Sequence, residues 1–248
     1  MERDRHGSGE LNHESRGRSA ADFEALWNRE VYVIDEANRR GDGTSAVGVA
    51  DSGNWPDLGT AGRIYVKRQQ AFFCRPPWNG FRRTPTLRRE LRFIEAARAL
   101  GVRVPDVALY REGSNDRALL VLQEIEGALD LEKSVASLDE VEREELFKNV
   151  GKTLARLHSG QIMHGAIYPK HLLVEGTTSR VWMIDFEKAR RVAFRSRAAT
   201  RDIARLVRHA PFMTGSDLEA LVSAYDARVF PDLLRRLRDL KPISQSYR

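Results

Sequence analysis

At 248 residues, with 42% hydrophobic and 31% charged residues, the chain is long enough and mixed enough to bury a globular core. No stretch approaches the roughly 18 uninterrupted apolar residues of a membrane span, and the polar first twenty residues lack the apolar core of a signal peptide. The sequence therefore predicts a cytoplasmic protein. A single cysteine, Cys74, cannot form an internal disulfide, which agrees with a reducing compartment.

The chain is basic, with 41 Lys and Arg against 35 Asp and Glu. Many of its arginines lie between Arg63 and Arg103 and between Arg190 and Arg208. Such a surface attracts polyanions, and the candidates are nucleotide phosphates, anionic lipid headgroups, phosphorylated glycans and nucleic acid. Charge alone does not rank these partners.

The N-terminal half has the pattern of a sheet with one helix. Residues 1–22 are polar and without periodicity, which is typical of a disordered tail. Short β-rich runs follow from Val31 to Lys67, separated by Gly, Asn and Asp. Apolar residues at helical spacing then predict a helix from Pro85 to Leu100, and the two strands VALYR and ALLVLQEI come after it.

Beyond Gly127 the pattern changes to helices. Asp139 begins an amphipathic segment that ends at Ser159-Gly160, with apolar positions at Val141, Leu146, Val150, Leu154 and Leu157. Two strands, HLLV and RVWMID, follow, and the segment from about Ala198 to Leu240 is helical again, with apolar positions in DIARLV, DLEALVSAY and FPDLLRRL. We therefore expect an α+β fold of two lobes: 23–126 as a mostly antiparallel sheet with one helix, and 127–248 as a mainly helical lobe.

Residues suited to phosphoryl transfer occur in order along the chain, since that chemistry needs positive charge on the phosphates and a carboxylate that holds a metal. Lys67 ends the strand IYVK on the face opposite to Ile64 and Val66. Glu90 in the following helix is a natural partner for Lys67, and Glu95 competes with it. Between strand and helix, CRPPWNGFRRTPT is too long for a simple turn and predicts a structured loop.

The strongest local pattern is HGAIYPKHLLVEGTTSRVWMIDFEKAR, in which a loop and two strands place Asp185 directly after an apolar run. A carboxylate in that position can bind Mg²⁺, because this hard cation prefers oxygen ligands.

These motifs resemble those of lipopolysaccharide kinases of the Kdo/WaaP type and their InaA relatives, which have a protein-kinase-like fold. The similarity runs from about Val31 to Ala210 and is carried by strings such as YVKRQ, GVRVPDV, LHSGQIMHG, YPKHLLV, IDFEKAR and RDIARL. The resemblance implies ATP and Mg²⁺ as cofactors, with the phosphate-binding lobe at 23–126 and the catalytic and metal loops at 127–248.

On the nucleotide side, the resemblance makes Lys67 the phosphate-binding lysine and Glu90 its partner. It also makes Gln123, Glu124 and Ile125 the connector between the lobes, which meets adenine through backbone groups.

In the loops, the resemblance makes His164 a structural histidine, places Lys170 and His171 in the catalytic loop, and makes Asp185 a metal ligand. His171 stands where protein kinases have a metal-binding asparagine, and lipopolysaccharide kinases are similar to this chain in having histidine there. Asp202 resembles the buried carboxylate that steadies the catalytic loop.

The chain departs from the active family motif at Ala166. That motif reads His-Arg-Asp or His-Gly-Asp, with the aspartate as the base that receives the proton of the acceptor hydroxyl, and alanine cannot accept a proton. Loss of a positioned base costs about 10²- to 10⁴-fold in rate. The segment with Gly41 and Gly43 also lacks a full G-x-G-x-x-G motif, and Glu187 replaces a glycine, either as a second metal carboxylate or as an exposed acid.

Three functions follow as hypotheses. The first is a kinase that phosphorylates a sugar hydroxyl of the lipopolysaccharide core at the cytoplasmic side of the inner membrane, where the basic surface suits an anionic membrane or glycolipid. The second is a pseudokinase that binds nucleotide as a regulatory module, motivated by Ala166. The third, a nucleic-acid-binding protein, has only the charge in its favour, since no nucleic-acid-binding motif accompanies it. The sequence sets no oligomeric state.

Overall fold

The computed structural model describes residues 20–40, 42–176, 179–225 and 237. Residues 1–19 of the predicted tail, Gly41, and nearly all of the predicted helical segment FPDLLRRL lie outside this range. The first described helix begins at Ala20, so it includes the last three residues, 20–22, of the predicted tail.

The first lobe is built on a five-stranded antiparallel sheet with the order β1-β2-β3-β7-β6. These strands are β1 (Tyr32–Arg40), β2 (Gly43–Asp51), β3 (Arg63–Gln70), β6 (Val107–Glu112) and β7 (Arg117–Gln123). One short pair of strands lies within the predicted structured loop before the helix, and it comprises β4 (Phe73–Cys74) and β5 (Thr84–Pro85). The prediction of antiparallel strands over this half is confirmed.

Helices cover both faces of this sheet. Helix α1 (Ala20–Asn28) packs on one face together with the buried Trp55, and α2 (Thr86–Ala99) packs on the other. Because both faces are covered, β7 is apolar at successive positions: Leu119 and Val121 face α1, and Leu120 faces α2. The run ALLVL therefore lies in the centre of the lobe.

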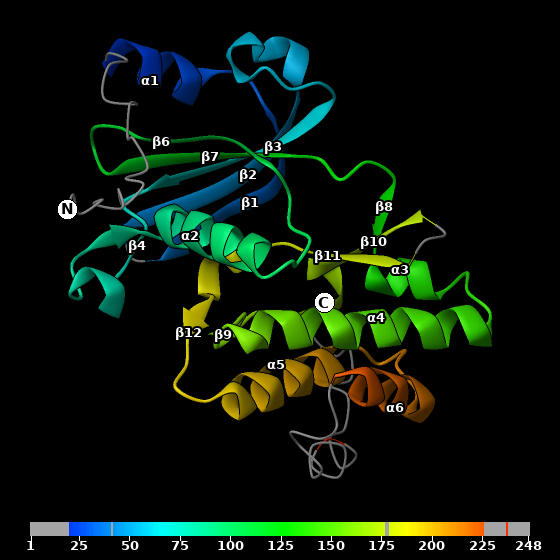
Figure 1. The fold of residues 1–248 in the computed structure, drawn as a ribbon. Coiled ribbons are helices and arrows are strands. Elements are labelled where there is room, and N and C mark those ends of the chain that lie inside the picture. Colours follow the sequence, from blue (N-terminus) through cyan, green and yellow to red (C-terminus); the bar gives the residue numbers. More distant parts are fainter. Residues whose placement is uncertain (1–19, 41, 177–178, 226–236, 238–248) are drawn as a thin grey trace, which may run out of the picture.

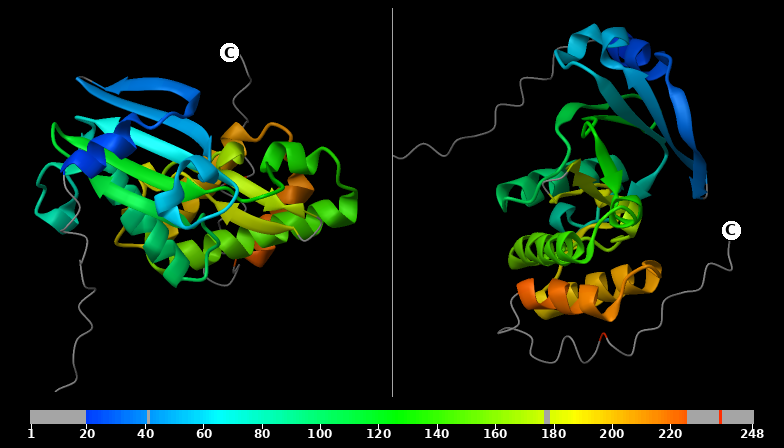
Figure 2. Two further views of the ribbon diagram at one scale, coloured as in Figure 1. Left: turned by 90° about the horizontal axis from the view of Figure 1, so that it is seen from above. Right: turned by 90° about the vertical axis from the view of Figure 1, so that its right-hand side faces the viewer.

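The second lobe is mainly helical and stacks below the sheet (Figure 1; Figure 2). Its helices are α3 (Leu131–Val135), α4 (Glu140–Ser159), α5 (Arg195–His209) and α6 (Gly215–Ala224). Two small antiparallel sheets lie between α4 and the first lobe, and their strands are β8 (Ala128–Asp130), β10 (Leu172–Glu175), β11 (Arg180–Met183), β9 (Ile162–Met163) and β12 (Arg190–Arg191).

Helix α4 starts where the sequence predicts, because Asp139 forms a capping box with Glu142. Its buried face includes Leu146, Val150 and Leu154, as expected from their spacing. Val141 is the exception: it lies in the first turn with 76% of its surface exposed, so the prediction of a buried position there is wrong. In the same turn Arg143 pairs with Asp217 of α6 at 2.6 Å, so Val141 lies on the solvent side of that turn.

Candidate active site

A cavity of about 690 Å³ lies between the five-stranded sheet and the loops of the second lobe. Strands β2 and β3 and helix α2 supply one wall, and the segments that contain His171 and Asp185 supply the other. Its charged lining residues, which come from both lobes, are Asp35, Lys67, Glu90, Glu124, Asp130, Lys133, Lys170, Asp185 and Glu187. The cavity therefore brings together charges that are more than a hundred residues apart in sequence.

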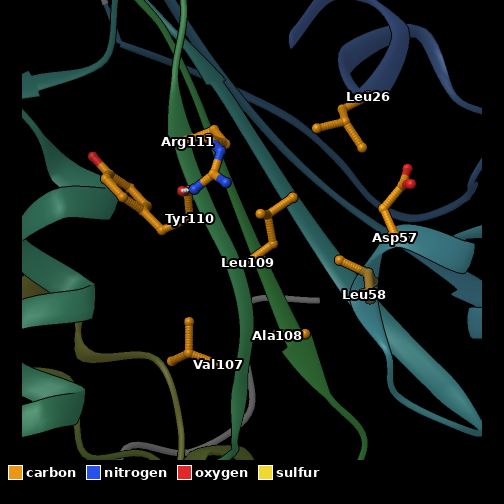
Figure 3. Close-up of a pocket in the computed structure, with 8 residues that line it drawn as sticks. All are labelled: Leu26, Asp57, Leu58, Val107, Ala108, Leu109, Tyr110 and Arg111. Atoms are coloured by element: carbon orange, nitrogen blue, oxygen red, sulfur yellow. Dashed lines mark hydrogen bonds between the residues drawn. The ribbon is translucent and has the colours of Figure 1, made fainter. Parts of the chain in front are cut away.

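A second pocket, of about 310 Å³, lies between α1 and β6 on the other face of the sheet (Figure 3). Leu26, Leu58 and Leu109 line it, with Asp57 at one side. Asp57 is already paired with Arg29 at 3.3 Å. With few converging polar groups, this pocket does not have the character of a catalytic site.

Lys67 lies between two carboxylates in the larger cavity. Its Nζ donates to Glu90 Oε1 at 2.6 Å and lies 3.7 Å from Asp185 Oδ1. The Glu90 side chain is 1% exposed, whereas the competing Glu95 is exposed to solvent. The structure thus brings Lys67 together with Glu90 and not with Glu95.

Burial and charge act in opposite directions on this group of three. Burial alone would lower the pKa of Lys67, but Glu90 and Asp185 offset it and raise that pKa. Burial raises the pKa of Glu90 to about 6 in spite of Lys67. For Asp185, burial is outweighed by Lys67 and His171, which hold its pKa below the usual value. At neutral pH, Lys67 is a cation between two carboxylates.

Gln69 fixes the helix that carries Glu90. Proline at position 85 gives α2 no side-chain cap. Instead, the buried Gln69 of β3 accepts hydrogen bonds through Oε1 from the Thr86 hydroxyl at 2.6 Å and the Leu87 N–H at 3.2 Å. Because Gln69 is two residues from Lys67 on the same face of β3, this cap sets the position of α2 relative to Lys67.

The catalytic-loop segment is fastened to the second lobe by Asp202. This carboxylate is fully buried and accepts from the backbone N–H groups of His164 at 2.7 Å and Gly165 at 2.9 Å. It also bonds to His158 Nε2 at 3.1 Å, and His158 Nδ1 lies 2.8 Å from the Tyr225 hydroxyl. The geometry is that of a support for the loop, as the resemblance implied for Asp202.

His164 links the two loops that flank the site. Its Nε2 donates to the Ile184 carbonyl at 3.0 Å, one residue before Asp185, and its ring packs against Phe186 with centroids 4.7 Å apart. Complete burial lowers the pKa of His164 to about 4, so the ring is neutral at physiological pH. Asp185 itself has φ 65°, ψ 64°, a conformation that non-glycine residues adopt at a cost of roughly 1–3 kcal/mol and that is frequent at functional sites.

His171 and Asp185 face each other in a way that suits a cation. His171 Nδ1 lies 2.7 Å from the Ala166 carbonyl, which can only accept, so Nδ1 carries the hydrogen. Burial lowers the pKa of His171, which leaves Nε2 without a proton at neutral pH. That Nε2 lone pair is 3.2 Å from Asp185 Oδ2. Two acceptors this close fit a shared metal ion.

No group of three or more His, Cys, Asp or Glu residues that could hold a metal is found in the described part of the chain. His171 and Asp185 could supply two of the ligands that Mg²⁺ needs, and phosphate and water would supply the others. Glu187 lines the same cavity but is not part of such a group.

Two of the three backbone N–H groups of the connector between the lobes form hydrogen bonds within the protein. The N–H of Gln123 donates to the Asp106 carbonyl at 2.8 Å, and the N–H of Glu124 donates to the Arg63 carbonyl at 3.0 Å. Over the described residues, the N–H of Ile125 makes no backbone hydrogen bond. Of the three predicted adenine contacts, Ile125 thus has the N–H that is available to a ligand.

On the acceptor side, Ala166 is 1% exposed and offers only a methyl group. Lys170 is exposed at the rim of the cavity. Tyr168 lies between them in sequence; its hydroxyl accepts from Arg205 at 3.0 Å, and its ring meets the His209 ring edge-on with centroids 4.7 Å apart. Gly43 begins β2, and Gly41 lies outside the described residues.

The comparisons with known proteins identify the family and the fold. The sequence profile of the lipopolysaccharide kinase (Kdo/WaaP) family matches residues 24–225, and the chain belongs to that family. It is 27% identical to protein InaA of Escherichia coli (strain K12) over 217 residues, which cover 83% of this chain and 96% of InaA. A shorter match of 99 residues, 32% identical, covers 40% of this chain and 16% of a probable bifunctional tRNA threonylcarbamoyladenosine biosynthesis protein of Methanospirillum hungatei.

Among solved structures, WaaP in complex with acyl carrier protein superposes with a TM-score of 0.64 at 19% identity, over 90% of this chain and 91% of WaaP. The predicted bilobal, kinase-like α+β fold is therefore confirmed. None of the helices in the described ranges is long and apolar enough to cross a membrane.

Several residues of the site were not predicted from the sequence. These are Gln69, His158, Asp130 and Lys133, of which Gln69 and His158 act through contacts that are distant along the chain. A local pattern was available only for Asp130, which caps α3 by accepting from the Lys133 N–H at 2.9 Å.

Proposed function

We propose that this chain is an ATP- and Mg²⁺-dependent phosphotransferase that acts on a sugar hydroxyl of the lipopolysaccharide core. The observation that carries the proposal is Lys67, held between Glu90 at 2.6 Å and Asp185 at 3.7 Å inside a cavity between two lobes. Membership of the lipopolysaccharide kinase family supports the same reaction and the same acceptor class.

Each residue has a defined task in this proposal. Lys67 binds nucleotide phosphates, with Glu90 and Gln69 fixing its direction, and Ile125 offers its N–H to the base. Asp185 and His171 hold the metal, and Lys170 adds positive charge at the rim where charge spreads over the transferred group. Bound Mg²⁺ neutralises phosphate charge and orients the transferred group.

The acceptor side works without the usual base. With alanine at position 166, no side chain of that residue can take the acceptor proton, and a positioned base contributes about 10²- to 10⁴-fold. Since phosphoryl transfer has a loose transition state in most analyses, positioning and electrostatics supply most of the catalysis. We therefore expect this protein to be a slow kinase that acts at the cytoplasmic face of the inner membrane.

The test is transfer of radiolabelled phosphate from ATP to purified core oligosaccharide. We expect Mg²⁺-dependent labelling by the wild type and a loss of about 10²-fold or more in Asp185→Asn, because the variant weakens binding of the cation that neutralises the phosphate charge. Glu187→Gln, a neighbouring carboxylate outside the His171–Asp185 pair, is the matched control and retains most activity. Absence of labelling by the wild type would contradict the proposal.

Ala166 also favours a second function, that of a nucleotide-binding regulatory module without transfer. The family match lends it no support, so it rests on this residue alone. It predicts that Mg-ATP raises the melting temperature of the wild type while no product forms, and that Ala166→Asp creates transfer activity. Labelled product from the wild type decides against it.

A further inference from the structure

Helix α5 carries a stripe of arginines on one face. Arg197, Arg201 and Arg205 are four residues apart and so lie one above the other. The opposite face is buried in the second lobe, with Asp202 and Leu206 among its residues. We call Arg197, Arg201 and Arg205, together with Arg190 of β12, the arginine cluster.

The arginine cluster borders the catalytic-loop segment. Arg190 pairs in register with Met163, directly before His164, and a Cβ placed at Gly165 would lie 3.5 Å from Arg190 Nη1. At the other end, Arg205 donates to the Tyr168 hydroxyl at 3.0 Å. Figure 1 shows β12 beside β9, with the chain leading from β12 directly into α5. The cluster therefore flanks Ala166 on the acceptor side of the loop.

The charges of the arginine cluster are not compensated by ion pairs within the described part of the chain. Other arginines of this protein do have such partners: Arg88 pairs with Glu112 at 2.5 Å, and Arg98 pairs with Asp106 at 3.0 Å. The carboxylate nearest to the cluster, Asp202, is already occupied by the loop N–H groups and His158.

The like charges of the cluster affect one another. Burial and then Arg201 lower the pKa of Arg190, with smaller effects in the same direction from Arg197 and Arg205, while Asp202 acts against them. A cluster of like charges costs stability unless a ligand of opposite charge binds there. Guanidinium groups match phosphate oxygens in two-point geometry, which makes a phosphate group the best-suited ligand.

We propose that Arg190, Arg197, Arg201 and Arg205 form a subsite for a phosphate group carried by the acceptor. This inference deepens the proposed function and rests on it. Binding of this phosphate group by the arginine cluster holds the acceptor hydroxyl near the transferred phosphoryl group. Such positioning compensates in part for the missing base at position 166, which is alanine. The acceptor is thus a sugar that is already phosphorylated elsewhere.

The binding test uses three small probes at equal concentration and low salt: glucose 6-phosphate, glucuronate and glucose. We expect glucose 6-phosphate to raise the melting temperature of the wild type more than glucuronate does, and glucose to have no effect, since a ligand that binds only the folded state stabilises it. The shift disappears in Arg197→Gln/Arg201→Gln. Equal shifts with glucuronate, or a shift that persists in the double variant, would overturn the proposal.

Two further variants keep this test decisive. Lys67→Met retains the shift, because the phosphate does not bind in the nucleotide cavity, and loss of the shift there would count against the subsite. Arg98→Gln removes a paired arginine elsewhere and also retains it. Both substituted positions of the double variant are exposed, so it is expected to fold, and without ligand its melting temperature stays equal or rises as repulsion is removed.

The transfer assay separates this inference from the function on which it rests. In Arg197→Gln/Arg201→Gln we expect the KM for core oligosaccharide to rise about tenfold or more, which corresponds to the loss of one charge-assisted hydrogen bond. The KM for ATP should stay unchanged. A rise in both KM values would contradict a subsite on the acceptor side. If the wild type transfers nothing, the proposed function fails, while phosphate binding by the cluster is still decided by the melting temperatures.

Discussion

The two sides of the cleft differ in how completely they are built. On the nucleotide side, Lys67, Glu90 and Asp185 are joined by short contacts, and Gln69 holds the helix behind them. On the acceptor side, Ala166 has no polar side chain, and the arginine cluster beside the loop has no ion-pair partners among the described residues. The comparison separates two steps. The side chains expected to bind nucleotide are present, whereas the side chain that usually receives the proton of the acceptor hydroxyl is absent.

Breaking the Lys67 contacts gives the largest expected effect. Lys67→Met leaves Glu90 buried without a counter-charge, which costs about 3 kcal/mol at pH 8. The pKa of Glu90 is already about 6 in the folded protein, above its ordinary 4.5, and without Lys67 it is higher still. The folded state therefore holds that proton more tightly than the unfolded state, so stability returns as the pH falls.

Urea unfolding at pH 8 and pH 5 measures this effect. The control Lys67→Met/Glu90→Gln carries no buried charge at either position, so its stability relative to the wild type should change much less with pH. An equal deficit for Lys67→Met at both pH values would show that Glu90 is not its charge partner.

His164 connects the two sides and gives the next effect. Its folded pKa of about 4 lies below its ordinary 6.5, so the unfolded state binds the proton first on acidification. The stability that this ring supplies is full above pH 6.5 and falls by about 3 kcal/mol as the pH drops to 4. We expect His164→Gln to lose less stability over that interval than the wild type, as measured by urea unfolding at half-unit steps. A variant with the same pH dependence would contradict the assignment to His164.

Removing the cap from α2 is a smaller change on the nucleotide side. Gln69→Leu leaves the Leu87 N–H and the Thr86 hydroxyl without their acceptor, at a cost of about 1–2 kcal/mol. Because Glu90 then loses its fixed position, the melting-temperature shift with Mg-ATP falls as well. Gln70→Leu, at the next position of β3, is the matched control. If Gln69→Leu loses stability but keeps the melting-temperature shift with Mg-ATP, Gln69 has a structural role only.

The smallest effect is expected at Tyr168, on the acceptor side. Tyr168→Phe removes the hydroxyl that accepts from Arg205, a half-buried contact worth about 0.5–1 kcal/mol. Thermal unfolding should show a small decrease, and the Mg-ATP shift should stay unchanged. A reduced Mg-ATP shift would show that the two sides are coupled more strongly than their contacts indicate.

The sequence predicts much of the nucleotide side because its residues lie in periodic elements. Lys67 follows from the alternation of IYVK, and the helical pattern after Pro85 includes Glu90. The choice between Glu90 and Glu95 needed the structure, since both lie on one helix and only packing decides which is buried. Val141 shows the limit of periodicity at a helix end, where a position of the apolar pattern is exposed to solvent.

Other parts could not be predicted because they depend on contacts between distant segments. Gln69 caps a helix that begins seventeen residues after it, and His158 meets Asp202 across forty-four residues. The concentration of arginines from Arg190 to Arg208 is visible in the sequence, but their position beside the catalytic-loop segment is set by the pairing of β12 with β9 and by Asp202.

The most direct test of a complete nucleotide side is calorimetric titration of ATP into the wild type and Asp185→Asn, each with and without Mg²⁺. The account predicts binding by the wild type that strengthens with Mg²⁺, and at least about tenfold weaker binding by the variant in Mg²⁺, because in the proposed function Asp185 and His171, which lie 3.2 Å apart, hold the cation. Absence of ATP binding by the wild type would contradict the account. Equal ATP affinity of the wild type and the variant, with and without Mg²⁺, would contradict it as well.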